Sequence, residues 1–120
     1  MEELTFSIPL HKRQFQNLLA EDDTFPGDTE RIALFYIISG NSDLYRKRSY
    51  IYDFKKHSIK KCLQNEEVDF SSSMKSLIRL GFNLYNGYTD NSTSPAALFY
   101  SLDEDNQRLA LSAISIRFIL

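Results

Sequence analysis

Three residue types that can build a nucleophilic site occur close together, at Asp53, His57 and Cys62. On a helix, Asp53 and His57 would stand four residues apart, so the carboxylate could orient the histidine as a base. Cys62 would still have to fold back onto His57, and no nucleophile elbow or oxyanion loop surrounds it. We interpret the first two residues as a surface pair and the cysteine as incidental, and we expect no catalytic residue and no enzyme activity.

The sequence also lacks motifs for metals and cofactors. His11 and His57 are the two histidines and stand far apart, so no cluster has the spacing of a zinc site. The acidic run from Asp103 starts like a calcium-binding loop, but Arg108 stands where that loop needs glycine and Ile114 where it needs glutamate. No glycine-rich phosphate-binding motif occurs. We expect no metal site, no cofactor and no cofactor-binding residue.

Half of the basic residues lie between residues 46 and 61, with aromatic residues among them. Contacts to phosphates and stacking on bases require this composition. It also fits a solvated lysine-rich surface with inward-facing aromatics, or a positive patch that meets an acidic protein. The residues concerned are Arg46, Lys47, Arg48, Lys55, Lys56, Lys60 and Lys61, with Tyr45, Tyr50, Tyr52 and Phe54.

A binding surface within this segment is the main functional prediction. Tyrosine and arginine are enriched at protein interfaces, where they supply a large share of the binding energy. The predicted interface consists of Tyr45, Arg46, Arg48, Tyr50, Tyr52, Lys55 and Lys56. Its favoured partner is another protein, with a second copy of this chain as one candidate, and nucleic acid is the alternative.

An apolar segment at residues 74–87, MKSLIRLGFNLYNG, organises the predicted fold. On a helix its apolar side chains span an arc of about 200°, so other elements must cover more than one side. The serines before it can cap the helix, and Gly87 can end it in the left-handed conformation. Gly81 lacks a side chain in the middle and indicates a close helix crossing. We expect a central buried helix at about 74–86.

Local signals predict further helices in the first half of the chain. Ser7, with Pro9 just inside, starts a first helix that runs until the acidic residues at 21–23. Asp28 or Thr29 caps a second helix, which contains the apolar run IALFYII and stops at Gly40. A buried strand could also have that composition, but the cap and the glycine favour a helix. The charged segment that follows predicts a short helix, a bend and another short helix.

The last third of the chain carries two more start signals. Ser94 followed by Pro95 predicts a short helix, and Asp103 with acidic residues after it predicts a final helix. In the end of that helix, residues 113–120, apolar residues alternate as they do in a strand, and we assign it to helix. The sequence thus predicts one all-α domain of five or six helices over residues 1–120.

Composition indicates a soluble globular protein. Apolar residues make up 42% of the chain and the formal net charge is -2, which favours neither a general nucleic-acid binder nor an acidic tail. The single cysteine excludes an intrachain disulfide and fits a reducing compartment. No apolar run approaches the length of a membrane span, and the acidic start differs from a signal peptide. We expect a cytoplasmic location and no membrane association.

Four stretches carry a resemblance to a known family: ALFYIISGNSDLY (33–45), IYDF (51–54), two serines with LIRLGFNLYNGY (72–88), and LD with LALSAISIRF (102–118). Together they resemble a family of small uncharacterised proteins, a domain of unknown function, of Gram-positive bacteria and their phage-like mobile elements. The resemblance implies a bacterial cytoplasmic setting and names no catalytic or binding residue.

These observations predict a small cytoplasmic, non-enzymatic protein-binding module. If a mobile element encodes the chain, a host protein is the expected target, for example a component of a defence system that the module inhibits. The alternative is an accessory protein that binds nucleic acid through the basic segment 46–61.

Overall fold

The apolar run IALFYII forms the middle of α2 (Thr29–Ser39), in which every residue from 32 to 39 is buried. Asp28 caps this helix by accepting a hydrogen bond from the backbone N–H of Arg31 at 3.0 Å, and Gly40 follows its last turn. The computed structural model describes residues 4–6, 8–64 and 68–119. A helix that is apolar all round needs neighbours on several sides, and α2 therefore occupies the middle of the bundle.

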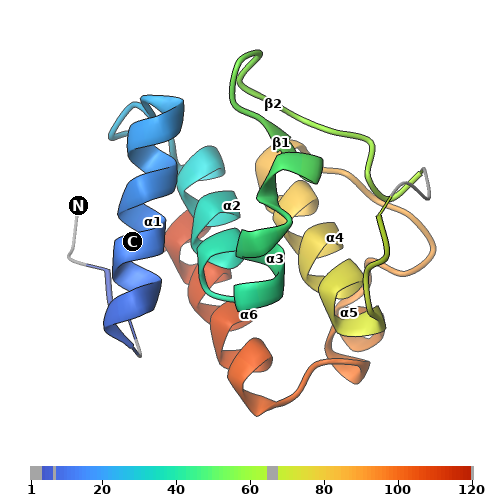
Figure 1. The fold of residues 1–120 in the computed structure, drawn as a ribbon. Coiled ribbons are helices and arrows are strands. Elements are labelled where there is room, and N and C mark those ends of the chain that lie inside the picture. Colours follow the sequence, from blue (N-terminus) through green and yellow to red (C-terminus); the bar gives the residue numbers. More distant parts are fainter. Residues whose placement is uncertain (1–3, 7, 65–67, 120) are drawn as a thin grey trace.

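Four helices contact α2. α1 (Pro9–Asp22) lies on one side, α4 (Ser72–Asn86) and α6 (Glu104–Phe118) lie on the other, and the short α3 (Ser42–Arg46) follows α2 directly (Figure 1). α5 (Pro95–Tyr100) packs against α4. The predicted all-α architecture is confirmed. The centre of the bundle is formed by α2 together with α4, the helix with which α2 makes its most extensive contact.

The prediction for α4 is confirmed in detail. Ser71 caps the helix by accepting from the N–H of Met74, and Gly87 ends it with a φ of 83°. Gly81 marks a close crossing with α2, since a Cβ atom there would stand 2.8 Å from Cδ1 of Leu34. A side chain at residue 81 would therefore force the end of the Leu34 side chain to move, and glycine lets α2 and α4 approach closely.

The structure also confirms the two later start signals. Ser94 caps α5 and Asp103 caps α6, each accepting a backbone N–H. The disputed end of α6 is helical to Phe118, because its buried residues recur every three or four positions: Leu109, Ala110, Ala113 and Ile116. Leu120, like Ser7 before α1, lies outside the described residues.

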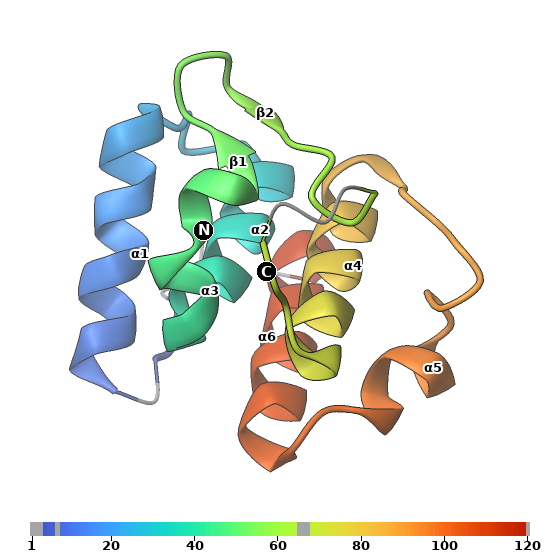
Figure 2. The ribbon, with the colours of Figure 1, turned by 45° about the vertical axis from the view of Figure 1, so that its right-hand side comes forward.

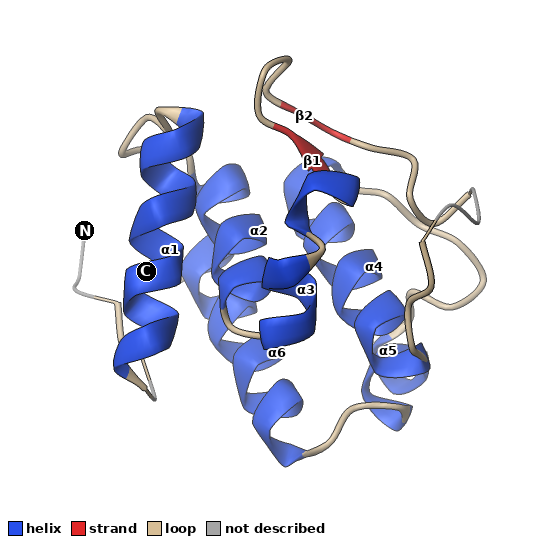
Figure 3. Ribbon diagram, viewed as in Figure 1, coloured by secondary structure: helices blue, strands red, loops and turns tan. Residues whose placement is uncertain are grey.

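One predicted element is wrong. In place of a second short helix, the chain after α3 forms one 3₁₀ turn, η1 (Arg48–Tyr50), and then an antiparallel hairpin of β1 (Tyr52–Asp53) and β2 (Ser58–Ile59) (Figure 3). The carboxylate of Asp53 accepts the backbone N–H groups of Lys55 and Lys56, which closes a turn. His57 adopts a left-handed φ of 55°. These local bonds compete with the helix and reverse the chain.

None of the helices in the described ranges is both long enough and apolar enough to cross a lipid bilayer.

Candidate functional site

The predicted interface residues follow one another along α3, η1 and the hairpin, which lie on the same side of the molecule in both ribbon views (Figures 1 and 2). Arg46, Tyr50, Lys55 and Lys56 are exposed, and Tyr50 keeps 45% of its surface accessible. Tyr45 and Arg48 are half-buried. Six of the seven predicted residues therefore reach the surface.

Tyr52 is the exception, and its assignment to the interface is wrong. Only 1% of its surface is accessible. Its ring packs edge-on against Phe35, with the centroids 4.9 Å apart, and against Phe54 at the same distance. The tyrosine is therefore a core residue, and its hydroxyl is used inside the protein.

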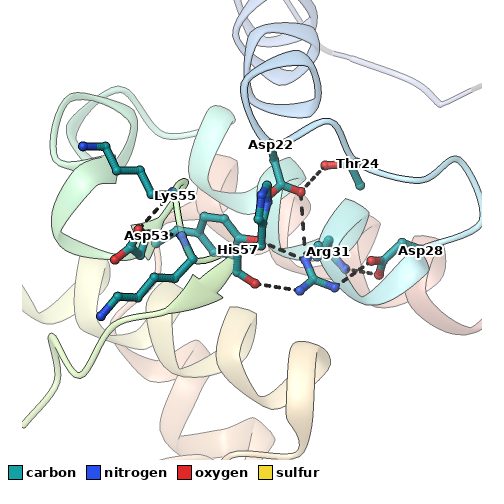
Figure 4. A network of polar contacts seen from close by, with 9 residues as sticks. Asp22, Thr24, Asp28, Arg31, Asp53, Lys55 and His57 are labelled. Carbon is teal, nitrogen blue, oxygen red and sulfur yellow. Dashed lines mark hydrogen bonds and ion pairs between the residues drawn. The ribbon is translucent and has the colours of Figure 1, made fainter.

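That hydroxyl belongs to a polar network around Asp22, in the last turn of α1 (Figure 4). The side chain of Asp22 is 2% accessible. Its Oδ1 accepts hydrogen bonds from the hydroxyl of Tyr52 at 2.7 Å and from Nδ1 of His57 at 2.8 Å. Its Oδ2 accepts from the hydroxyl of Thr24 at 2.6 Å. The carboxylate of Asp22 on α1 thus holds the hairpin at two points: Tyr52 in β1 and His57 just before β2.

Arg31 connects the same network to α2. Its Nε donates to the hydroxyl of Tyr52 at 2.9 Å and lies 3.9 Å from Oδ2 of Asp22. One terminal nitrogen donates to Asp28 at 2.8 Å, and the other donates to the backbone carbonyl of His57 at 2.7 Å (Figure 4). All three guanidinium nitrogens are engaged, so the hairpin is tied to α2 as well as to α1.

The network sets the ionisation of its members. Burial raises the pKa of Asp22, but the hydrogen bonds from Thr24, His57 and Tyr52 outweigh this effect and hold the pKa below its ordinary value. Burial raises the pKa of the Tyr52 hydroxyl well above its ordinary range. At neutral pH, Asp22 is therefore a carboxylate and Tyr52 a neutral donor, as both hydrogen bonds require.

Acid should weaken the fold through Asp22. Because its pKa is lower in the folded than in the unfolded state, its contribution is complete above the unfolded value of about 3.9 and disappears as the pH falls through the folded value. We expect the free energy of unfolding, measured with urea from pH 6 to pH 3, to fall more steeply in the wild type than in Asp22→Asn. Asp23→Asn, an exposed neighbour, should follow the wild type. Parallel curves for the wild type and Asp22→Asn would contradict this account.

Asp53, His57 and Cys62 do not form a nucleophilic triad. Asp53 is occupied by backbone N–H groups, and the partner of His57 is Asp22, not Asp53. Cys62 is buried, and burial raises the pKa of its thiol to about 11. A carboxylate that orients a histidine resembles part of a catalytic site, but here it fastens a hairpin to a helix. No group of three metal-ligating side chains occurs in the described part of the chain.

Cys62 should react slowly with alkylating agents. With a pKa of about 11 its thiolate fraction at pH 8 is roughly 100-fold below that of an ordinary cysteine, and burial blocks access further. We expect iodoacetamide to modify native Cys62 at least that much more slowly than an exposed cysteine introduced by Ser49→Cys in a Cys62→Ala background. In urea the two rates should converge. Fast modification of the native thiol would show an activated cysteine.

The basic side chains of residues 46–61 fall into two groups, those that contact other groups of the protein and those that extend into solvent. Arg46 pairs with Asp43 at 2.8 Å, Lys47 donates to the backbone carbonyl of Asp69, and Arg48 donates to the carbonyl of Tyr45 at 2.9 Å. Within this segment, the exposed ammonium groups without an ion pair to a described residue belong to the hairpin and the chain after it. They are Lys55, Lys56, Lys60 and Lys61.

Sequence reasoning missed Asp22 and Arg31. The acidic run at 21–23 has the composition of a solvated helix end, and burial of its middle residue depends on partners 30 and 35 positions further along the chain. The spacing of Asp28 and Arg31, three residues apart at a helix start, was the one local signal available, and the pair does form.

Comparison with known proteins identifies a family. No curated protein and no solved structure matches the chain. A family model described as "Family of unknown function (DUF6075)" matches residues 1–119, which is nearly the whole sequence. The resemblance to a family of uncharacterised proteins is thereby confirmed. The chain belongs to the DUF6075 family.

Proposed function

We propose that this protein is a non-enzymatic binding module for a protein partner with an acidic surface. The contact face, called the hairpin face below, consists of Tyr45, Arg46, Arg48, Tyr50, Lys55 and Lys56. The observation that carries the proposal is the exposure of Tyr50 on η1, which lies along the chain between the cations of α3 and those of the hairpin. An accessible aromatic ring flanked by cations is a typical centre of a protein interface.

Contacts within the protein hold parts of the hairpin face in place. The guanidinium carbon of Arg48 lies 4.3 Å from the ring centroid of Tyr45, so these two side chains stack on one another. The hairpin is held by Asp22 from α1 and Arg31 from α2. Binding costs less when side chains and loops need not be ordered at the moment of association. This supports a rigid recognition surface rather than a segment that folds on binding.

Charge supports an acidic partner. Lys55 and Lys56 stand at the tip of the hairpin and have no ion pair within the described residues. Their field extends into solvent and would accelerate encounter with a negatively charged surface. The resemblance to proteins of Gram-positive bacteria and mobile elements supports a bacterial cytoplasmic setting, in which the partner would be a host protein such as a component of a defence system.

Affinity capture with paired variants tests this proposal. The protein and its Arg48→Ala/Tyr50→Ala variant are immobilised, and bound proteins from a Gram-positive lysate are compared by mass spectrometry. The control, Arg13→Ala/Tyr100→Ala, removes the same residue types from exposed positions on α1 and α5. We expect one protein to bind the wild type and the control, and to be lost from the hairpin-face variant. A partner retained by all three proteins, or captured by none, contradicts the proposal.

A second copy of the chain is tested separately. Sedimentation velocity over a wide concentration range would show self-association, and loss of that association in Arg48→Ala/Tyr50→Ala would identify the hairpin face as the contact between copies. A monomer at all concentrations leaves a different protein as the expected partner.

Nucleic acid is the second candidate. It is favoured by four exposed lysines, close together in the sequence, that have no ion pair to a described residue: Lys55, Lys56, Lys60 and Lys61. Binding that neutralises phosphates weakens steeply as salt rises, because condensed counterions are released. Fluorescence anisotropy with a labelled 20-nucleotide RNA and DNA, at about 50 and 200 mM salt, measures this dependence. Binding that falls with salt and is lost in Lys55→Gln/Lys56→Gln would favour this function over protein binding. No binding at the lower salt concentration excludes it.

A further inference from the structure

A pocket of about 550 Å³ lies near the other end of α2, away from the hairpin. Its walls come from the segment before α1, from His11, from the last turns of α2 and from the first half of α6. Sites for small molecules usually have volumes of about 300 to 1,000 Å³. The hairpin face and its proposed partner do not involve this pocket, so its occupant is a separate question.

His11 provides the main polar group of the pocket. The residue is 5% exposed, and its Nε2 lies 3.0 Å from the carbonyl oxygen of Tyr36. A carbonyl only accepts, so Nε2 carries a proton. Burial lowers the pKa of His11, although the bond to Tyr36 acts in the other direction, and the ring is therefore neutral. In a neutral imidazole the second nitrogen, Nδ1, then has a free lone pair.

That nitrogen keeps some accessible surface. Nδ1 has no hydrogen-bond partner among the described residues, yet every fully buried side-chain nitrogen and oxygen in the same set has one. Nδ1 must therefore have accessible surface, and the pocket is a space that His11 lines. A buried residue thus offers the pocket one unused hydrogen-bond acceptor.

The surroundings fix this acceptor in place. A Cβ atom on Gly40 would stand 3.0 Å from the His11 ring and would also meet Cδ1 of Leu109, so the absence of a side chain at residue 40 gives the imidazole room. Phe6 packs edge-on against His11, with centroids 4.8 Å apart. The hydroxyl of Tyr36 donates to the carbonyl of Thr5 at 2.7 Å, which holds the segment that carries Phe6.

The walls favour a flat, uncharged ligand. Phe6, Tyr36 and Leu109 give part of the wall an aromatic and aliphatic character that suits a planar ring, and polar residues such as Asn106 and Ser112 make up much of the rest. Asp105 and Arg108 bring opposite charges to the same pocket, so a charged molecule would lose hydration without gaining a net counter-charge. The acceptor at His11 requires that the ring carry a hydrogen-bond donor.

We propose that this pocket, the His11 pocket, binds a small planar molecule that donates one O–H or N–H group to Nδ1 of His11. Phenols and N–H heterocycles share this chemistry. The ring lies among Phe6, Tyr36 and Leu109, and the donated hydrogen bond fixes its orientation.

NMR titration of the full chain with paired compounds tests whether the ligand must donate a hydrogen bond. Phenol is compared with anisole, and indole with 1-methylindole, since each pair differs by a methyl group in place of the donated hydrogen. We expect saturable shifts at the backbone amides of His11, Gly40 and Ser112, with the methylated compound weaker by about tenfold, as the loss of one hydrogen bond predicts. The ¹⁵N resonance of His11 Nδ1 should shift with the donors alone. The stronger pair identifies the ligand as phenolic or heterocyclic.

Two variants place the effect in the pocket. His11→Phe keeps a ring and removes the acceptor, so phenol and anisole should bind it equally. Ser112→Phe keeps His11 itself, fills the pocket and should abolish the shifts, whereas Ser115→Phe, on the same helix outside the pocket lining, should preserve them. If His11→Phe does not fold, Ser112→Phe with its control decides. Equal binding of phenol and anisole to the wild type, shifts scattered over the surface, or no saturable shift would overturn the proposal.

Discussion

Replacement of Asp22 by alanine is expected to lower the free energy of unfolding by about 2 to 4 kcal/mol, because three hydrogen-bond donors lose a buried anionic acceptor. The loss should stay below the largest values known for breaking a buried ion pair. The reason is that the side chains of His57 and Arg31 are 52% and 28% exposed and retain access to water. Urea denaturation at pH 7 measures the change. Glu21→Ala removes an exposed carboxylate from the preceding position and should stay within about 0.5 kcal/mol of the wild type.

The same variant should loosen the hairpin more than the bundle. The backbone N–H of Lys60 donates to the carbonyl of Ile51 at 2.8 Å, and its hydrogen exchange reports on whether β2 stays attached. We expect faster exchange at Lys60 in Asp22→Ala, with little change at the buried amides of α2 beyond the global loss of stability. Uniform acceleration across the molecule would mean that Asp22 supports the whole fold and has no special role in the hairpin.

Replacement of Phe35 by alanine should lower the free energy of unfolding by at least as much as Asp22→Ala does. This residue is fully buried on α2, with its ring edge-on to Tyr52 and stacked on Phe54 at 5.9 Å. Phe35→Ala is expected to cost about 3 to 5 kcal/mol, from lost burial and the cavity that remains. A domain of ordinary stability has about 5 to 15 kcal/mol in total, so this variant should unfold partly at moderate temperature. Calorimetry measures the shift.

A second substitution separates packing from polar bonding at this place. Tyr52→Phe keeps the ring against Phe35 and removes the hydroxyl that joins Asp22 to Arg31. Its cost should be smaller than that of Phe35→Ala, and it should reduce the acid sensitivity assigned to Asp22. A larger cost for Tyr52→Phe than for Phe35→Ala would mean that the polar network, and not the aromatic cluster, holds the hairpin.

The helices could be predicted because their signals are local. Asp28, Ser71, Ser94 and Asp103 each accept a backbone N–H within three residues, and Gly87 ends α4 one residue after its last turn. Such bonds depend on neighbours in the sequence alone. The apolar periodicity of α4 and the solid apolar run of α2 then required the two helices to pack together.

The hairpin could not be predicted from the same signals. Its strands have two residues each, too short for an alternating pattern to show, and their attachment depends on Asp22 and Arg31 in other elements. For the same reason Tyr52 was placed on the surface with its neighbours in sequence. The exposure of Lys55 and Lys56 could be predicted, because long cationic side chains are rarely buried, wherever the backbone turns.

The central position of α2 has a consequence for synthesis. Its apolar residues are complete once residue 39 has emerged from the ribosome, but its partner α4 ends at Asn86 and α6 ends at Phe118. During elongation, part of the apolar surface of α2 therefore stays exposed until α4 and α6 have been synthesised. Nascent chains that lack α6 should bind chaperones and aggregate when released. We therefore expect the bundle to form late in synthesis, and the hairpin to be attached to α1 and α2 only after that point.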